Sequence, residues 1–154
     1  MTTIAYDGEI LAADGRVSRG GVIVSETFKK IVKRDCCGTE VLIASCGYAR
    51  LSFLFIKWVE NGMDLDEWEI EDPDEEYEGL VIAGEKVLSF SGDGLVMPFE
   101  APFSIGSGSE LALGAMKAGK SAIGAVKIAS ETDIFTGGIT TAYKRTSEGW
   151  ISIN

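Results

Sequence analysis

The stretch Met1-Thr2-Thr3-Ile4-Ala5-Tyr6 begins the chain, and Asp7-Gly8 follows it directly. Asp-Gly between two apolar runs is a strong signal for a two-residue hairpin turn, so residues 2–6 and 9–13 are predicted to pair as strands. Removal of Met1, which the small Thr2 side chain permits, would make Thr2 the N-terminal residue. An N-terminal Thr carries a nucleophilic hydroxyl and a basic α-amine in one residue.

The N-terminal residues alone leave two interpretations of Thr2 open. Thr2 is either a nucleophile or simply the beginning of an edge strand. The chain contains no His, so the commonest general base is missing. That absence favours the α-amine as the base, if Thr2 is a nucleophile.

Length and composition predict one domain spanning residues 1–154. The chain is 45% hydrophobic, which is enough for a core of ordinary size. It has no apolar run of membrane-spanning length and no secretion signal at its N-terminus. Its three cysteines, Cys36, Cys37 and Cys46, form a poor disulfide framework and lack zinc-ligand spacing. We therefore expect a cytoplasmic protein with no metal and no cofactor.

The net charge of −10 comes from one segment. Ten of the 24 acidic residues lie between Asp64 and Glu78, which leaves 14 acidic residues against 14 basic ones elsewhere. The segment lacks the glycine and the ligand pattern of an EF-hand, so a solvated loop is favoured over a calcium site. Nucleic-acid binding is not expected, because the chain has no basic footprint.

Hydrophobic periodicity and turn residues predict groups of strands alternating with groups of helices. Residues 16–21 are predicted to form a loop. Helices are predicted over residues 48–61, 110–118 and 121–131. The remaining strands are predicted over residues 22–24, 28–34, 41–46, 80–83, 87–91, 95–98, 103–105, 139–144 and 150–153. This order indicates an α+β fold with antiparallel sheets rather than repeated βαβ units.

Residues 114–121, Gly-Ala-Met-Lys-Ala-Gly-Lys-Ser, match the pattern of a phosphate-binding P-loop. Such a loop must join a buried strand to a helix, so that its backbone N–H groups face the phosphates. Here the first half of the match has a helical composition, which places Gly-Lys-Ser between two helices. A nucleotide-binding function remains an alternative, but the context disfavours it.

Two further segments are weak signals when taken singly. Gly106-Ser107-Gly108-Ser109 follows a predicted strand and precedes a helix, where a Gly-rich turn brings backbone close to a ligand. Asp133-Ile134-Phe135-Thr136-Gly137-Gly138 follows a predicted helix, where an Asp and a Thr three residues apart can face one site. Each is more often a structural turn or a helix end.

Taken together and in order, these segments resemble the proteasome β-subunit and HslV peptidase family. The resemblance rests on Thr2-Thr3-Ile4, Ala13-Asp14-Gly15, Lys29-Lys30-Ile31, Gly106-Ser107-Gly108 and Asp133-Ile134-Phe135-Thr136-Gly137-Gly138. It covers most of the chain. It implies the α+β fold of the N-terminal-nucleophile (Ntn) hydrolases, an αββα sandwich of two antiparallel sheets between helical layers. It also implies a homo-oligomeric ring of six- or seven-fold symmetry, stacked on a second ring, that encloses the active sites.

The resemblance further implies roles for seven residues. Thr2 would be the nucleophile, Lys30 the buried cation beside it and Asp14 the carboxylate that pairs with Lys30. Gly47 would donate a backbone N–H to the oxyanion. Three further residues would surround the α-amine: Ser107, Asp133 and Thr136.

These roles are chemically coherent. A nearby Lys cation favours the neutral form of an α-amine, whose ordinary pKa is about 7.7–8.0. A buried cation is costly without a partner, and Asp14 would supply that partner to Lys30. An oxyanion donor contributes about 3 kcal/mol to such reactions. Strand alternation would turn the adjacent Lys29 to the opposite face, toward solvent.

The chain departs from the family mainly between residues 61 and 79. The family has a second long helix there, whereas this chain has the acidic segment, so one helical layer is expected to be reduced. A chain this compact is compatible with a phage or another minimal genome.

The resemblance predicts a threonine endopeptidase that cleaves unfolded polypeptide, with any ATP used by a separate unfoldase. Besides nucleotide binding, two alternatives remain open. One is a non-catalytic ring or decoy subunit that regulates a peptidase, and the other is an Ntn amidohydrolase acting on a small amide.

Overall fold

The computed structural model describes residues 1–68, 77–92 and 96–153. The chain separates into two compact units, residues 1–31 with 100–154 and residues 32–99. We call these the first and the second unit. The single domain expected over residues 1–154 stays a prediction. In the described part of the chain, no helix has the length and apolar composition needed to cross a membrane.

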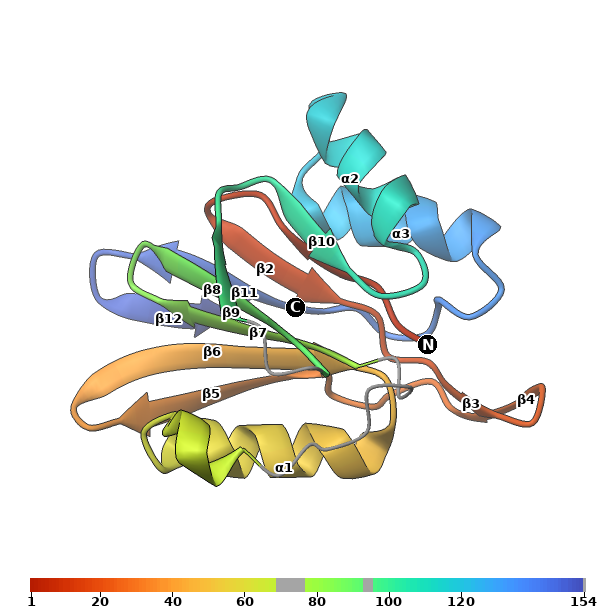
Figure 1. Cartoon of the computed structure of the whole chain (residues 1–154). Helices are drawn as coiled ribbons and strands as arrows, with labels where there is room; N and C mark the ends of the chain where they lie inside the picture. Colours follow the sequence, from red (N-terminus) through yellow and green to blue (C-terminus); the bar gives the residue numbers. More distant parts are fainter. Residues whose placement is uncertain (69–76, 93–95, 154) are drawn as a thin grey trace. The chain divides into compact units, whose positions relative to one another are not determined.

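The first unit contains a five-stranded sheet in the order β10-β1-β2-β11-β12, with antiparallel neighbours (Figure 1). The carboxylate of Asp7 closes the predicted hairpin by accepting hydrogen bonds from the N–H groups of Glu9 and Ile10, at 2.9 and 2.8 Å. Gly8 has a φ of 106°, which favours glycine. The strands are β1 (Ile4–Tyr6), β2 (Ile10–Ala13), β10 (Phe103–Ile105), β11 (Thr141–Thr146) and β12 (Gly149–Ser152).

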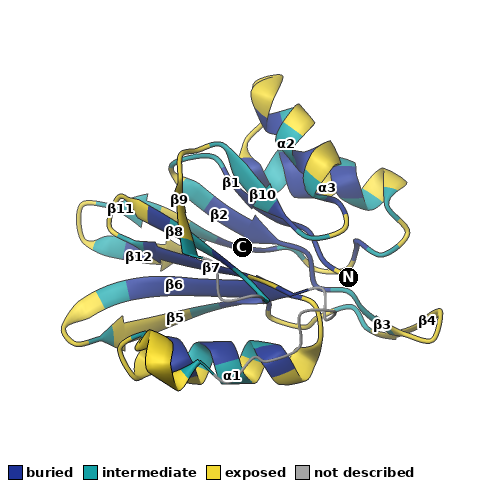
Figure 2. Cartoon of the chain, viewed as in Figure 1, coloured by how far each residue is buried: buried dark blue, intermediate teal, exposed yellow. Residues whose placement is uncertain are grey.

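Helices α2 (Ser109–Lys117) and α3 (Ala122–Thr132) pack on this sheet. The strand register places Ala5, Ala12 and Ala142 next to one another across β1, β2 and β11. The helices meet them largely with small side chains, of which Ala125 and Ala129 are fully buried. Figure 2 shows buried and exposed residues along both helices. Short side chains on both surfaces let the helix backbones approach the sheet closely, and this packing is what positions the ends of α2 and α3.

A two-stranded ribbon of β3 (Val17–Arg19) and β4 (Val22–Ser25) follows β2 (Figure 1). The sequence prediction of a loop over residues 16–21 is wrong, because Val17–Arg19 form a strand. Gly20 and Gly21 have φ values of 57° and 80°, so they make a tight two-residue turn that lets the strand pair. On β4 three apolar residues are exposed, Val22, Ile23 and Val24.

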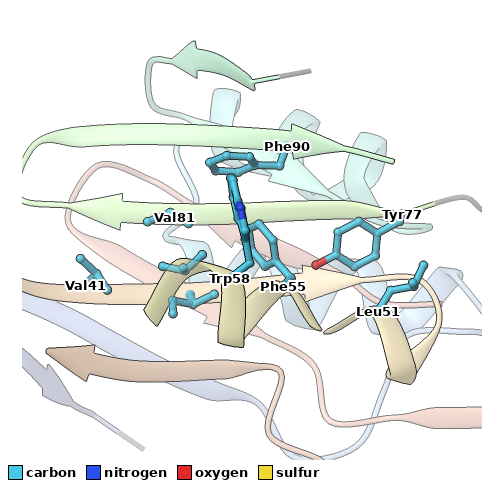
Figure 3. Packing of buried hydrophobic residues seen from close by; sticks show 9 residues of the cluster. Val41, Leu51, Phe55, Trp58, Tyr77, Val81 and Phe90 are labelled. Carbon is cyan, nitrogen blue, oxygen red and sulfur yellow. The ribbon is translucent and has the colours of Figure 1, made fainter. Parts of the chain in front are cut away.

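The second unit has a five-stranded sheet in the order β5-β6-β7-β8-β9. Helix α1 (Ala49–Glu60) packs on it through Phe55, which lies against Trp58, Tyr77 and Phe90 (Figure 3). Gly79 leaves the space that the Phe55 ring fills. The strands are β5 (Ile31–Cys36), β6 (Thr39–Cys46), β7 (Glu78–Ala83), β8 (Lys86–Ser91) and β9 (Val96–Phe99).

In the described residues of the second unit, α1 is the one α-helix, followed by a single 3-10 turn, η1 (Leu65–Glu67). This agrees with the predicted reduction of one helical layer. The predicted loop over the acidic segment is therefore partly a 3-10 turn, and its residues 69–76 lie outside the described residues. The predicted turn at Asp93-Gly94 also lies outside them.

The other predicted elements are present with shifted ends. The strand predicted from residue 28 begins at Ile31, so Lys30 lies in an irregular segment before β5. The strand predicted from residue 139 begins at Thr141. The three predicted helices are confirmed as α1, α2 and α3.

Candidate active site

The N-terminal residues lie inside the first unit rather than on its surface. Thr2 is 4% exposed and Thr3 is fully buried, whereas Met1 is 54% exposed. Both threonines precede β1, whose pairing with β2 and β10 anchors the start of the chain. The two residues before the strand are thus buried, and Met1 is the exposed end of this segment.

Asp14 and Lys30 form a buried ion pair beside this chain end. The Nζ of Lys30 lies 2.8 Å from Oδ1 of Asp14, and the two side chains are 4% and 1% exposed. The N–H of Thr3 donates to the same Oδ1 at 2.9 Å. The adjacent Lys29 is exposed, as predicted, although the segment is not a strand. Lys30 is therefore a buried cation with a buried counter-ion, and its role beside a nucleophile stays a prediction.

The second oxygen of Asp14 is held by two backbone groups. Oδ2 accepts hydrogen bonds from the N–H of Arg16 at 3.1 Å and from the N–H of Gly137 at 3.0 Å. Four donors from different segments thus satisfy this carboxylate, as a buried charge requires. The bond from Gly137 ties the pair to the loop that follows α3.

The Asp14–Lys30 pair is one polar group of the site. The loop after α3 and the turn before α2 contribute a second polar group, made of Ser107, Asp133 and Thr136, which we call the Asp133 group. Asp133 Oδ2 accepts hydrogen bonds from the hydroxyls of Thr136 at 2.6 Å and Ser107 at 2.8 Å. Burial by itself would raise the pKa of the Asp133 carboxyl. The bonds from Thr136, Ser107 and the N–H of Phe135 outweigh it and hold that pKa below its ordinary value. Asp133 is therefore a carboxylate at neutral pH.

Ser107 connects this group to Thr2. Its Oγ lies 3.3 Å from the backbone nitrogen of Thr2 and 3.4 Å from the Thr2 carbonyl oxygen. The flanking glycines make this approach possible. A Cβ on Gly106 would overlap the Thr2 carbonyl, and a Cβ on Gly108 would overlap Oγ1 of Thr3. The Gly-Ser-Gly turn, for which the sequence left a ligand-facing and a purely structural role open, thus lies against the chain's own N-terminal residues.

Lys30 also contacts the Met1–Thr2 peptide bond, whose cleavage would make Thr2 the N-terminal residue. Its Nζ lies 3.3 Å from the carbonyl oxygen of Met1. While Met1 is attached, the Thr2 nitrogen is an amide and cannot accept a proton. Loss of Met1 would turn it into an amine next to Ser107 and remove one acceptor from Lys30.

Six of the seven predicted site residues thus come together in the first unit: Thr2, Asp14, Lys30, Ser107, Asp133 and Thr136. The seventh, Gly47, belongs to the second unit, where it follows β6 with a φ of 109°. Its oxyanion role stays a prediction.

Cys46 is a buried residue, as expected for a core position. Its Sγ lies 3.4 Å from Oε2 of Glu78. Burial and the negative charge of Glu78 raise the pKa of the Cys46 thiol well above its ordinary value, so it is a poor nucleophile.

The P-loop match does not have the structure of a P-loop. Its first residues, from Gly114, lie within α2, and its last, Ser121, caps α3 by accepting a hydrogen bond from the N–H of Gly124. The segment therefore joins two helices and begins inside α2, whereas a P-loop must follow directly on a strand.

Sequence reasoning missed two residues that shape the site. Thr3 contacts both polar groups through its N–H and its hydroxyl. Arg16 donates to the carbonyl of Ile134 at 2.9 Å and pairs with Glu26 at 3.1 Å, which holds the loop after α3. No local pattern singles out Thr3, since the residues that it contacts through its N–H and its hydroxyl are distant in sequence.

No family model matches the sequence, and no curated protein sequence matches it. Among solved structures, the chain is similar to the crystal structure of eukaryotic HslV from Trypanosoma brucei, with a TM-score of 0.71 and 22% identity. The match covers 92% of this chain and 96% of that chain. The chain has a proteasome/HslV-like fold. This confirms the Ntn-hydrolase fold class predicted from the sequence, whereas the phage origin stays a prediction.

Proposed function

We propose that this chain is a threonine endopeptidase that acts after Met1 is removed and that cleaves unfolded polypeptide. One observation carries the proposal: the Thr2 nitrogen lies 3.3 Å from Ser107 Oγ, which is itself bonded to the Asp133 carboxylate. Such a carboxylate and hydroxyl can hold and orient an N-terminal amine. The buried Asp14–Lys30 pair beside the same chain end supplies the cation that disfavours protonation of that amine.

The proposed reaction uses Thr2 alone as nucleophile and base. The Thr2 amine takes the proton of the Thr2 hydroxyl, and the Oγ1 attacks the carbonyl carbon of the peptide bond. The backbone N–H of Gly47 is the proposed donor to the resulting oxyanion. The amine then protonates the leaving nitrogen, which leaves an ester on Thr2, and water hydrolyses that ester.

We propose that the active form is a homo-oligomeric ring of six or seven subunits, stacked on a second ring. The exposed apolar residues of β4 support assembly, because an uncovered apolar strand is a ready surface for pairing. A separate ATP-dependent unfoldase would supply the unfolded substrate. The cytoplasmic location predicted from the cysteines stays a prediction.

The test combines mass spectrometry with a covalent inhibitor that reacts with N-terminal threonine. We expect a chain that lacks Met1 and carries one adduct on Thr2, with no adduct on Thr2→Ala. Thr2→Ser, which keeps a hydroxyl nucleophile, should still be labelled. A Met1-free chain that takes up no inhibitor would overturn the proposal. Light scattering would distinguish a ring from a monomer or dimer, and the latter would favour an amidohydrolase acting on small amides.

A non-catalytic ring or decoy subunit is the second candidate function. The contact between Lys30 Nζ and the Met1 carbonyl favours it, because the chain accommodates Met1 without disturbing the ion pair. Retention of Met1 on the purified ring, together with no adduct on Thr2, would support this alternative.

A further inference from the structure

Thr3 joins the two polar groups of the candidate site. Its N–H donates to Asp14 Oδ1 at 2.9 Å, and its hydroxyl lies 2.6 Å from the hydroxyl of Thr136. The side chain is fully buried, and Gly108 lies directly against its Oγ1. A residue next to the proposed nucleophile thus contacts both the ion pair and the Asp133 group.

Counting protons gives a direction to these hydrogen bonds. A carboxylate can only accept, so the hydroxyls of Thr136 and Ser107 must each donate their single proton to Asp133. Thr136 has no second proton, so it accepts at its bond to Thr3, and Thr3 is the donor. Ser107 likewise accepts at its contact with the Thr2 nitrogen.

This order matters for the Asp133 carboxylate. A hydroxyl that accepts one hydrogen bond becomes a stronger donor in the next, because the bonds polarise one another. The Thr3 proton therefore strengthens the bond from Thr136 to Asp133. It also prevents Thr136 from turning its proton toward Thr3, which would leave Asp133 with one hydroxyl donor fewer.

We propose that Thr3 is a positioning residue whose hydroxyl donates to Thr136 and so keeps Asp133 and Ser107 aligned on the Thr2 amine. This inference rests on the proposed function and names a further residue of the same site. Thr3 does not touch the reacting atoms through its hydroxyl. It acts through Thr136.

The variants Thr3→Val and Thr3→Ser form a matched pair. Valine keeps the shape of threonine and removes the donor, whereas serine keeps the donor and removes a methyl group. The first readout is the pKa of the Asp133 carboxyl, measured by carbon-13 NMR with Asp133→Asn to assign the signal. We expect Thr3→Val to raise this pKa toward the ordinary Asp value and Thr3→Ser to leave it close to that of the unmodified chain.

The second readout is the rate of acylation of Thr2 as a function of pH. In Thr3→Val we expect a roughly three- to tenfold lower rate of acylation, the equivalent of one neutral hydrogen bond. We also expect the acidic limb of the pH–rate profile, where the rate falls in acid, to move to higher pH. In Thr3→Ser both the rate and the position of the acidic limb should match those of the unmodified chain. A purely structural role would lower the rate without moving the limb.

The two readouts separate this inference from the proposed function. An unmodified chain that is not acylated sinks the peptidase proposal but leaves the pKa comparison valid. An Asp133 pKa that is the same in Thr3→Val and in the unmodified chain overturns the inference, whatever the activity. If Thr3→Val does not fold, neutron diffraction of the deuterated, unmodified chain tests the inference by locating the deuterium between the hydroxyls of Thr3 and Thr136. Deuterium on Thr3 Oγ1 directed at Thr136 supports the inference, and the opposite direction overturns it.

Discussion

The carboxylate of Asp14 and the ammonium of Lys30 lie 2.8 Å apart, with 1% and 4% of their side chains exposed. Both residues belong to the first unit, where Asp14 directly follows β2 and Lys30 lies in an irregular segment beside the N-terminal residues. Backbone N–H groups satisfy the remaining positions on Asp14. Each charge is therefore buried because the other one is present.

Removing one charge of this pair should destabilise the chain strongly. Asp14→Asn leaves the Lys30 cation buried without its counter-ion, and we expect a loss of about 3 kcal/mol in the free energy of unfolding. The double variant Asp14→Asn/Lys30→Met should lose less than the single variant, because no unpaired charge remains. Denaturant unfolding measures both. Lys29→Met, at the exposed neighbouring position, is the control and should change stability by less than about 0.5 kcal/mol. Equal stability of Asp14→Asn and the unmodified chain would contradict the role given to the pair.

The lowered pKa of Asp133 gives Ser107→Ala a pH-dependent effect on stability. A carboxyl whose pKa is lower in the folded chain stabilises it above the unfolded pKa of about 3.9, and that contribution is lost as the pH falls through the folded pKa. Ser107→Ala removes one bond that lowers the pKa. The variant should therefore be less stable than the unmodified chain at neutral pH, and the difference should shrink in acid.

The control for this experiment is Ser130→Ala, because the Ser130 hydroxyl donates to the carbonyl of Lys127 and to no carboxylate. Its effect on the free energy of unfolding should be the same at all pH values. A Ser107→Ala effect that is equally independent of pH would show that Asp133 does not depend on this hydroxyl.

Gly108→Ala should disturb the site sterically. The added Cβ would overlap Oγ1 of Thr3 and crowd Oγ1 of Thr136, so one strand end or the start of α2 must move. We expect a loss of roughly 1–3 kcal/mol, typical of overpacking, together with lower activity. Gly114→Ala is the matched control, since nothing lies within 4 Å of the new Cβ. That variant should gain up to about 1 kcal/mol because alanine favours helix. Calorimetry compares the melting temperatures of the two variants. Equal melting temperatures would contradict the close packing at Gly108.

The three cysteines should react with a thiol reagent in a fixed order. Cys37 is exposed at the turn between β5 and β6, whereas burial raises the pKa of Cys36 and, much more strongly, that of Cys46. We expect Cys37 to be alkylated first and Cys46 only after unfolding, as read by peptide mass spectrometry. The Cys37→Ser variant is the control for the fast phase. Rapid labelling of Cys46 in the folded chain would reopen its assignment as a core residue.

Ile23→Lys should interfere with assembly and not with folding of the chain itself. Ile23 is 49% exposed on β4, and a charge there should oppose burial of this strand against another copy. We expect a smaller particle by light scattering and an unchanged unfolding transition of the subunit. Ile151→Lys, on β12 with a similar exposure of 47%, is the matched control and should keep the particle size. A full-sized particle with Ile23→Lys would exclude β4 from the contact.

The local elements of this fold depend largely on residues that are close to one another in the sequence. Asp7-Gly8 predicts the first hairpin because the Asp7 side chain can bond to the backbone two and three residues later. Apolar spacing predicts α1, α2 and α3 because each buries one face. For the two-stranded ribbon the sequence predicts β4 but not β3. The reason is that Val17–Arg19 and the two glycines that follow have the composition of a loop, and Val17–Arg19 become a strand only by pairing with β4.

The sequence by itself determined which residues are candidates for the site and their order along the chain, through a resemblance carried by short motifs, but it did not single out Thr3 or Arg16. The tertiary structure alone decided how they connect. Thr3 and Thr136 are 133 positions apart, and Gly137 bonds to Asp14 across 123 positions. No local pattern records such pairs, because they form only when the sheet and the two helices on it have packed and buried the polar groups that must find partners.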